Sequence, residues 1–345
     1  MEKATISDMK KVTIKDVARE AGISVTIASF ALNNVKGRVS SEVRQKVLDC
    51  AKRLGYTPNT FAKNLRNKNS NTIALVYDQS YLEERNASTL QFVTGAIKRA
   101  KEKGKDVLIK LIDMESEIQN TFDEYVELWV SQRVDGIIFQ CSGNEEGLIK
   151  RMREENVNFV VIPSVKKLSG ADSVYIDNYR LMKEGVDYIF KKGYTEIYYL
   201  TMKNSDMPER ELGFADAIKE LKINGRQLYY TSRFRGKEEL WELLKDIVKD
   251  RNGKIAIACW NDVDAINVIE ILQSKGIRIP GEIGVMGFDD IPASEHTYPT
   301  LTTIRQPFDE MARSAVDILI SNHKRSNDEI QCVEIEGMII ERQSI

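Results

Sequence analysis

Histidine and cysteine are scarce in this chain, and their spacing fits no catalytic or metal-binding pattern. The two histidines, His296 and His323, both lie in polar stretches and are expected on the surface. The four cysteines, at positions 50, 141, 259 and 332, are far apart and form no C-x-x-C pair, so neither a metal site nor a disulfide framework is predicted. The sequence also has no phosphate-binding G-x-x-x-x-G-K and no nucleophile elbow in a Ser/His/Asp order. We therefore expect no enzymatic activity, no metal and no cofactor.

Long hydrophobic runs are absent as well. No stretch approaches the roughly 20 apolar residues that a membrane-spanning helix needs. Residues 1–12 are polar and do not have the apolar core of a secretion signal. Scattered cysteines fit a reducing compartment. Together these absences predict a cytoplasmic protein without a membrane partner.

What the chain does have is a compact helical stretch near its start. Thr13 and Asp16 have the spacing of a capping box, which predicts the beginning of a helix. Gly22 suits the left-handed conformation that ends a helix, and Ser24 can cap a second helix that runs to about Leu32. A third helix is predicted to begin at position 40 or 41. Two helices joined by a glycine-containing turn form a helix-turn-helix, in which the second helix enters the DNA major groove.

Residues near the start of the second helix are the candidates for contacting base edges. They are Val25, Thr26, Ser29 and Phe30. The charge distribution agrees, because residues 1–70 contain 14 basic and 6 acidic side chains, whereas the remainder contains 36 basic and 46 acidic ones. A basic helical unit on an acidic body is typical of nucleic-acid binders. Charge alone would fit the solvated face of any small helical domain equally well, and the capped helix pair favours DNA.

This stretch resembles the opening of the LacI/GalR family of bacterial transcription regulators. The resemblance lies in residues 13–24, TIKDVAREAGIS, and continues through Arg44, residues 54–56 (LGY) and residues 58–65 (PNTFAKNL). It implies that Thr13 and Ser24 belong to the DNA-binding set, and that a hinge helix contributes Asn59, Ala62, Lys63 and Leu65. It also implies a homodimer on a palindromic operator, with Leu65 of each subunit wedged into the minor groove, as apolar side chains that kink base steps are.

Two residues of the second helix depart from the family pattern. Ile27 replaces a hydroxyl that would contact phosphate, and Phe30 replaces a side chain that usually hydrogen-bonds a base. Phe30 could press on a thymine methyl group or simply shield the helix, and the sequence favours neither. The departures leave the operator sequence open, whereas DNA binding is still expected.

Beyond a polar linker at 68–71, the pattern changes to strands alternating with helices. The expected strands are 73–77, 107–112, 136–139, 159–162, 174–176, 197–200, 255–259 and 283–288, with helices such as 92–104 and 118–132 between them. This alternation predicts parallel sheets built from βαβ units. Because the strands are too many for one ordinary sheet, we expect two similar sheets with a cleft between them. Ligands of such sheets bind outside the carboxyl ends of the strands.

The body extends the resemblance, since the family's body is similar to a periplasmic sugar-binding protein with two lobes and three crossovers. Matching stretches are residues 261–262 (ND), 276–280 (GIRIP), 287–290 (GFDD) and 301–307 (LTTIRQP). The resemblance implies effector-binding roles for Arg210, Asn261, Asp289 and Phe308. Asn261 and Asp289 directly follow predicted strands, and Arg210 offers a planar fork of hydrogen-bond donors.

Three neighbouring residues have competing interpretations. Asp262 and Asp290 also follow strands, but a carboxylate there is commonly structural, as in a helix cap, and we favour that role. Trp260 stands where the family usually has a small residue. Its ring could stack on the apolar side of a sugar, or it could fill core space. We include Trp260 in the candidate effector set.

The sequence thus predicts an α/β protein in three parts. Residues 12–57 are the helix-turn-helix headpiece, 58–70 the hinge helix and linker, and 71–345 a two-lobed body for effector binding and dimerisation. We expect a dimeric repressor whose operator affinity is changed by a small ligand, with a sugar as the first candidate. The alternatives are a regulator that responds to a non-sugar corepressor or a protein partner, and a transport-type solute-binding protein, which the headpiece argues against.

Overall fold

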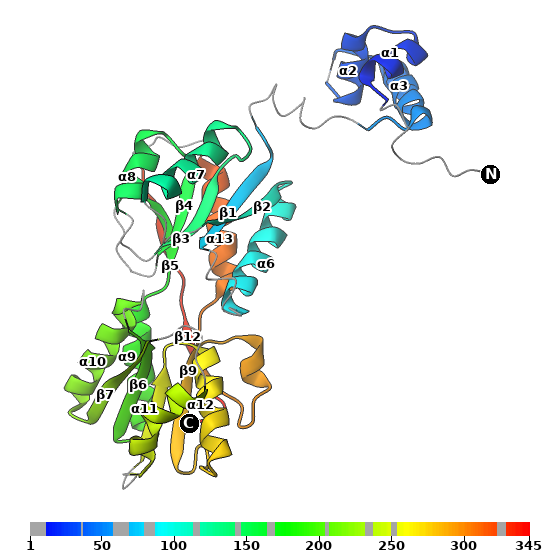
Figure 1. Ribbon diagram of the computed structural model, residues 1–345. Helices are drawn as coiled ribbons and strands as arrows, with labels where there is room; N and C mark the ends of the chain where they lie inside the picture. The colour runs from blue at the N-terminus through cyan, green and yellow to red at the C-terminus, as the bar shows by residue number, and fades with distance from the viewer. Residues whose placement is uncertain are drawn as a thin grey trace. The chain divides into compact units, whose positions relative to one another are not determined.

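The computed structural model describes residues 12–35, 37–57, 69–78, 87–112, 118–141, 146–163, 170–203, 207–231, 237–249, 254–322 and 329–345. The chain divides into two compact units, Met1–Lys68 and Asn69–Ile345 (Figure 1). The predicted hinge residues Asn59, Ala62, Lys63 and Leu65 lie outside the described residues. Among the helices that are described, none is long and apolar enough to cross a membrane.

The described part of the first unit contains three helices: α1 (Ile14–Ala21), α2 (Val25–Leu32) and α3 (Ser41–Leu54). The backbone N–H and the hydroxyl of Thr13 donate to the Asp16 carboxylate at 3.0 and 2.7 Å, which fixes the start of α1. Gly22 ends α1 with a φ of 66°. A small apolar core holds the three helices together: Val17, Ala18, Ala21, Ala28, Ala31, Val47, Cys50 and Ala51.

Two six-stranded sheets form the second unit, each in a lobe of its own (Figure 1). The first has the order β11-β5-β4-β3-β1-β2, and the second has the order β12-β10-β9-β8-β6-β7. The strands of the first lobe are β1 (Thr72–Asp78), β2 (Asp106–Ile112), β3 (Ile137–Cys141), β4 (Phe159–Pro163), β5 (Asp172–Tyr175) and β11 (Cys332–Glu334). Those of the second lobe are β6 (Glu196–Met202), β7 (Asn224–Tyr230), β8 (Ile255–Cys259), β9 (Ile283–Asp289), β10 (Thr302–Arg305) and β12 (Met338–Ile340).

Helices cover both faces of each sheet. In the first lobe, α6 (Ala87–Glu102) and α13 (Phe308–Ser321) pack together, and α7 (Ile118–Val130) and α8 (Glu146–Glu154) contribute to a separate apolar cluster with the other face. In the second lobe, α9 (Asn178–Lys191) and α10 (Pro208–Leu221) cover one face, and α11 (Lys237–Lys249) and α12 (Asp262–Ser274) cover the other. Because both faces of most strands are buried under helices, most strand sequences are continuous apolar runs.

The chain passes between the lobes three times, as the family resemblance implies. The crossings lie between β5 and α9, between β10 and α13, and between β11 and β12. The largest apolar cluster contains buried residues of both lobes, from Ile73 and Leu75 in β1 to Phe288 in β9. The α/β class and the two sheets are therefore confirmed, while the strand set was incomplete.

The sequence prediction missed four strands, and it also missed one antiparallel strand pairing. β7, β10, β11 and β12 were not predicted, because β7 begins with polar residues and the other three are only three or four residues long. β12 pairs with β10 in the antiparallel direction, so the second sheet is not wholly parallel. An antiparallel edge strand on an otherwise parallel sheet is common in folds of this class.

Asp135 fixes the first residues of the second unit through hydrogen bonds and an ion pair. Its Oδ1 accepts from the backbone N–H and the hydroxyl of Ser70 at 2.6 and 2.9 Å. Its Oδ2 pairs with Lys105 Nζ at 2.8 Å, and this pair is largely shielded from solvent. Lys105 Nζ also donates to Asn69 Oδ1 at 3.2 Å. The first residues of the unit are thereby fixed to the N-terminal edge of the first sheet.

Candidate nucleic-acid interface and ligand site

The outward side of α2 is the candidate DNA-reading surface. Ala28 and Ala31 are fully buried in the first core, so positions 26 and 30 on the opposite side of the helix point away from it. Val25 and Ile27 flank this side, with exposed fractions of 42% and 37%. α2 contains no charged residue, so the accessible side chains on and beside this side are apolar or hydroxyl-bearing.

The polar side chains predicted for DNA binding are partly engaged within the unit. Ser24 Oγ accepts the backbone N–H of Ile27 at 3.2 Å, and this contact caps α2. Asn33 Nδ2 donates to the Ser29 carbonyl at 2.9 Å and reaches the Ser29 hydroxyl at 3.4 Å. Thr26 is exposed. Phe30 is half-buried, and the Arg38 guanidinium lies 6.0 Å from the centroid of its ring.

Arg210 is the centre of the candidate ligand site in the second lobe. It lies near the start of α10 and is 2% exposed. Its Nε donates to Asn178 Oδ1 at 2.9 Å, and its Nη1 donates to the Trp260 carbonyl at 2.5 Å. Its guanidinium carbon lies 3.6 Å from the centroid of the Phe288 ring, and its Nη2 lies 4.0 Å from Asp289 Oδ1. These contacts hold the guanidinium at the carboxyl ends of β8 and β9.

Asp289 is the last residue of β9 and is buried. Its Oδ1 accepts from Gln306 Nε2 at 2.5 Å. Burial raises the pKa of this carboxyl to about 7, because desolvation outweighs the opposing effect of Arg210. Its φ of 119° lies in a region that side chains rarely adopt, which costs on the order of 1–3 kcal/mol. A buried, strained carboxyl with a pKa near 7 is typical of a functional position.

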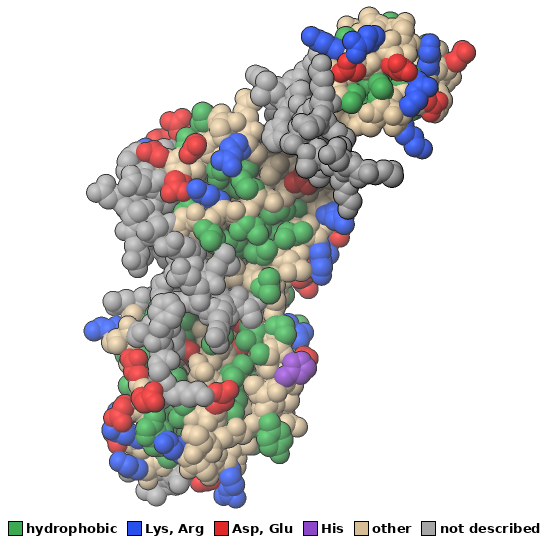
Figure 2. Space-filling view, turned by 45° about the vertical axis from the view of Figure 1, so that its right-hand side comes forward, with side chains coloured by type: hydrophobic (Ala, Val, Ile, Leu, Met, Phe, Trp, Pro, Cys, Tyr) green, Lys and Arg blue, Asp and Glu red, His purple; other side chains and the backbone are tan. Residues whose placement is uncertain are grey.

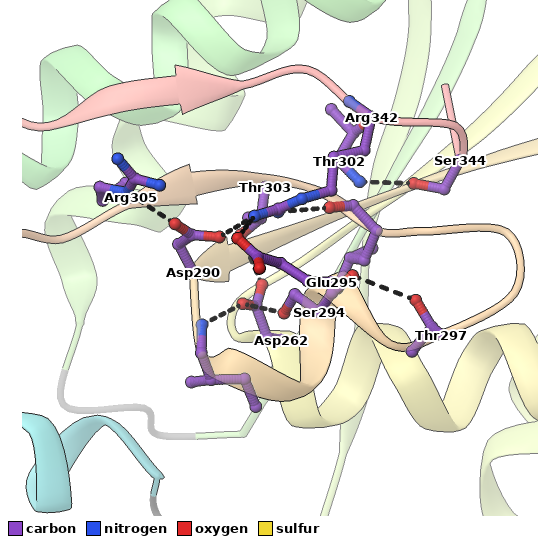
Figure 3. Close-up of polar contacts among 12 residues, drawn as sticks. Asp262, Asp290, Ser294, Glu295, Thr297, Thr302, Thr303, Arg305, Arg342 and Ser344 are labelled. Atoms are coloured by element: carbon purple, nitrogen blue, oxygen red, sulfur yellow. Dashed lines mark hydrogen bonds and ion pairs between the residues drawn. The ribbon is translucent and has the colours of Figure 1, made fainter.

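Asp262 has the structural role expected for a carboxylate that follows a strand (Figure 3). Its Oδ2 accepts from the backbone N–H of Ile291 at 2.9 Å and from the Ser294 hydroxyl at 2.6 Å, and its Oδ1 accepts from the Thr303 hydroxyl at 2.5 Å. Burial raises its pKa to about 6. The Asp262 carboxylate lies so close to the backbone of residue 287 that only glycine fits there, since a Cβ at Gly287 would lie 2.1 Å from Asp262 Oδ1.

Asp290 is likewise occupied by protein partners. Its Oδ2 accepts from Arg305 Nε at 2.6 Å, and its Oδ1 accepts from Arg342 Nη2 at 2.7 Å (Figure 3). Arg342 also donates to the Leu301 carbonyl and to Glu295. Asp290 therefore joins β9, β10 and the C-terminal segment, and both of its carboxylate oxygens are engaged in doing so.

Asn261 and Trp260 follow β8 directly and are both half-buried. Asn261 caps α12, because its Oδ1 accepts the backbone N–H of Asp264 at 2.8 Å. The indole N–H of Trp260 donates to Asp264 Oδ2 at 2.5 Å, and the Tyr230 hydroxyl donates to the same oxygen at 2.9 Å. Trp260 also packs against two apolar clusters, the one that spans both lobes and the one confined to the second lobe. Its ring is thus locked in orientation and keeps some exposure.

Phe308 is connected to this cluster through the chain that leaves β10. It is the first residue of α13 and is half-buried, and its backbone N–H donates to the Gln306 carbonyl at 2.8 Å. Gln306 in turn donates to Asp289. Four of the five predicted effector residues, Arg210, Trp260, Asn261 and Asp289, are thus linked through side-chain contacts, whereas Phe308 is linked to them through the backbone of its own segment.

Three further residues of this cluster were not predicted: Asn178, Asp264 and Gln306. Asn178 follows β5 closely and is 3% exposed, a burial that its amide alone does not predict. Asp264 lies inside a helix, where its contacts with Tyr230 and Trp260 depend on tertiary packing. Within the described ranges, no group of three or more His, Cys, Asp or Glu side chains is placed to hold a metal ion.

Comparisons with known proteins agree with this arrangement. A family model described as bacterial regulatory proteins, lacI family, matches residues 13–59, and a periplasmic binding protein-like domain matches residues 186–345. The chain is 33% identical over 310 residues to the HTH-type transcriptional regulator DegA of Bacillus subtilis (strain 168), which covers 87% of this chain and 88% of that protein. The chain belongs to the LacI family.

Solved structures share the fold of this LacI-family chain. The lac repressor dimer bound to operator and the anti-inducer ONPF superposes with a TM-score of 0.81 at 22% identity, covering 97% of this chain and 99% of that one. A complex of the transcriptional regulator CelR with cellobiose gives 0.67 at 20% identity, covering 96% and 99%. As a LacI-family member, the chain is a ligand-modulated, DNA-binding transcriptional regulator, and these relatives are regulators rather than enzymes.

Proposed function

We propose that this chain is a homodimeric repressor that binds a palindromic operator and changes its operator affinity when a sugar binds beside Arg210 and Asp289. It acts in the cytoplasm, with residues 12–57 reading the DNA, residues 58–70 as hinge and linker, and residues 71–345 binding the effector. The observation that carries the proposal is the buried Arg210–Asp289 cluster in a chain whose other unit is a helix-turn-helix.

The chemistry of the cluster fits a polyol. A guanidinium supplies several donors in one plane, and a carboxyl with a pKa of about 7 can accept from a hydroxyl when ionised or donate to one when protonated. Trp260 adds an oriented aromatic ring, which suits the apolar side of a sugar ring. The structural neighbour complexed with cellobiose supports the same ligand class.

An apolar face on the first lobe supports the homodimer. Four large side chains of α6 and β2 are exposed there, with exposed fractions of 43–66%: Leu90, Ile97, Ile109 and Leu111. Figure 2 shows hydrophobic side chains gathered on this lobe. Exposed apolar patches of this kind mark interaction surfaces, and the lac repressor neighbour is a dimer.

A ligand screen with full-length protein tests the effector assignment. Sugars, sugar phosphates and nucleobases are added in turn, and the unfolding temperature is measured. A ligand at 100 times its Kd stabilises by about 2.7 kcal/mol, or on the order of 5 °C for a body of this size. We expect a sugar to produce this shift, and the same sugar to change the affinity for an operator selected from random DNA.

Variants of two arginines show whether the shift comes from the proposed site. Arg210→Met should abolish the shift. The control Arg180→Ala, at a partly exposed and ion-paired arginine of α9, should keep it. A full shift in Arg210→Met would contradict the site. Operator binding without any sugar response, but with a response to a nucleobase or a protein, would replace the sugar with that effector.

A further inference from the structure

The recognition helix of this chain lacks the side chains that usually read purines. Arg and Lys bind guanine edges in the major groove, and Asn and Gln make paired hydrogen bonds with adenine. The sequence of α2, VTIASFAL, contains none of these residues. Discrimination between bases by α2 must therefore depend on other side chains.

Hydroxyl groups on α2 supply little of that discrimination. The Ser24 hydroxyl caps the helix, and the Ser29 hydroxyl lies within reach of Asn33. Thr26 is the exposed hydroxyl on the outward side. A single hydroxyl can donate to or accept from several different bases, so it distinguishes them weakly.

The apolar side chains of α2 match the one apolar group that a base edge offers in the major groove, the C5-methyl of thymine. Val25 stands at the start of the helix with 42% of its surface exposed. Phe30 lies one turn beyond Thr26 on the same outward side. The Arg38 guanidinium, 6.0 Å from the Phe30 centroid, is within the range of a cation–π contact and restrains the ring.

We propose that α2 reads thymine methyl groups in each half of the operator. Val25 and Phe30 contact the methyl groups, and Arg38 is a positioning residue that holds the Phe30 ring. The proposal rests on the proposed function, because it requires an operator. It goes further in naming the base pairs beneath α2 as A·T.

Replacing thymine with deoxyuridine tests this directly, because the exchange removes only the methyl group. An operator is first selected from random DNA with the full-length protein. Each thymine of the half-sites is then replaced in turn, and the affinity is measured at one fixed salt concentration. Burial of a methyl-sized group contributes about 0.8 kcal/mol, so we expect a loss of about four-fold for each contacted methyl. Replacements outside the half-sites should change nothing.

Two variants connect the effect to the named side chains. Phe30→Ala should bind operators with thymine and with deoxyuridine equally well when the exchange is made at the position that Phe30 contacts. When the exchange is made at the position that Val25 contacts, Phe30→Ala should still lose affinity. Arg38→Ala should lower the thymine-to-deoxyuridine ratio at the Phe30 position as well as the overall affinity. An unchanged ratio in Arg38→Ala would overturn the positioning role.

The outcomes separate this inference from the proposed function. Enrichment of a defined operator, with equal affinity for every deoxyuridine form, would overturn methyl reading and leave the repressor assignment intact. Half-sites containing only G·C pairs under α2 would do the same. If no sequence is enriched at all, the proposed function itself fails.

Discussion

The two candidate sites depart from ordinary burial in opposite directions. On α2, the apolar side chains of Val25 and Ile27 face solvent, whereas at the ends of β8 and β9 the charged side chains of Arg210 and Asp289 are buried. Exposed apolar groups and buried charges both cost stability in the free protein. The difference indicates which kind of partner suits each proposed site. For α2 it is a large surface that removes apolar groups from water, and for the buried cluster it is a small polar molecule that exchanges hydrogen bonds with charged groups.

Variants at the two sites should differ in whether they change stability as well as function. A variant at the buried cluster should change both the unfolding free energy and the ligand response, because its side chains are part of the second lobe's packing. A variant on the outward side of α2 should change DNA affinity and leave stability almost untouched, because few protein contacts are lost. Four variants test this contrast, in order of decreasing effect.

Arg210→Ala should produce the largest effect. Removing the guanidinium leaves a cavity beside Phe288 and takes the donor away from Asn178 and from the Trp260 carbonyl. Loss of one partner from a buried charged cluster costs about 3–5 kcal/mol. Urea denaturation of the full-length protein measures this loss.

Arg180→Ala is the matched control for this measurement. Arg180 pairs with Glu184 and Glu336 on the surface of the same lobe. Exposed pairs of this kind contribute about 0–1 kcal/mol. Similar losses in the two variants would mean that the burial of Arg210 does not set its contribution, and the contrast between the two sites would lose its basis.

Asp289→Asn should change the pH dependence of stability. The pKa of Asp289 is raised from its ordinary value to about 7 in the folded protein, so the folded state holds the proton more tightly than the unfolded state does. Its contribution to stability is present at low pH and is lost as the pH rises through 7. Between pH 5.5 and 7.5 this loss is about 2 kcal/mol.

The measurement compares unfolding free energies of the two proteins at both pH values. Asp262 also has a raised pKa and stays in both proteins, so the difference between them reports Asp289 together with its electrostatic interaction with Asp262. The variant should lose less stability than the parent over this interval. Parallel pH profiles would show that Asp289 is already ionised at pH 5.5.

Trp260→Phe should have a smaller effect, of about 1–2 kcal/mol. The variant keeps an aromatic ring but removes the indole N–H, so Asp264 loses one of its hydrogen bonds while the one from Tyr230 remains. If the locked ring is the ligand platform, sugar affinity should fall as well, as measured by titration. Unchanged stability and affinity would assign Trp260 to neither role.

Local signals were sufficient to predict the three described helices of the first unit. Thr13, Gly22 and Ser24 mark helix ends through contacts within a few residues, and the structure has helices at the predicted places. The two-sheet body also followed from local patterns, because its buried strands are short apolar runs between helices. Short edge strands such as β11 and β12 carry too few residues for any pattern to emerge.

The candidate ligand cluster was predictable only in part. Arg210, Asn261 and Asp289 were named through the family resemblance and their places after strands. Nothing local predicts that Arg210 Nε meets Asn178, 32 residues away, or that the carboxyl of Asp289 has a pKa near 7. These properties arise from packing between segments that are distant in the sequence, so they cannot be predicted from local sequence patterns.

Val25→Ser should have the smallest effect on stability and sharpens the contrast most. Val25 is 42% exposed, so the change should stay within about 0.5 kcal/mol of the parent in thermal unfolding. Val47→Ala, at a fully buried position of the same unit, is the control, and deleting buried methyl groups there should cost at least about 1 kcal/mol. Operator affinity should fall in Val25→Ser, because a polar side chain replaces an apolar contact. If Val25→Ser destabilises the unit as much as Val47→Ala does, the Val25 side chain contributes to the stability of the fold. The interpretation of Val25 as a DNA-contacting residue would then lose its support.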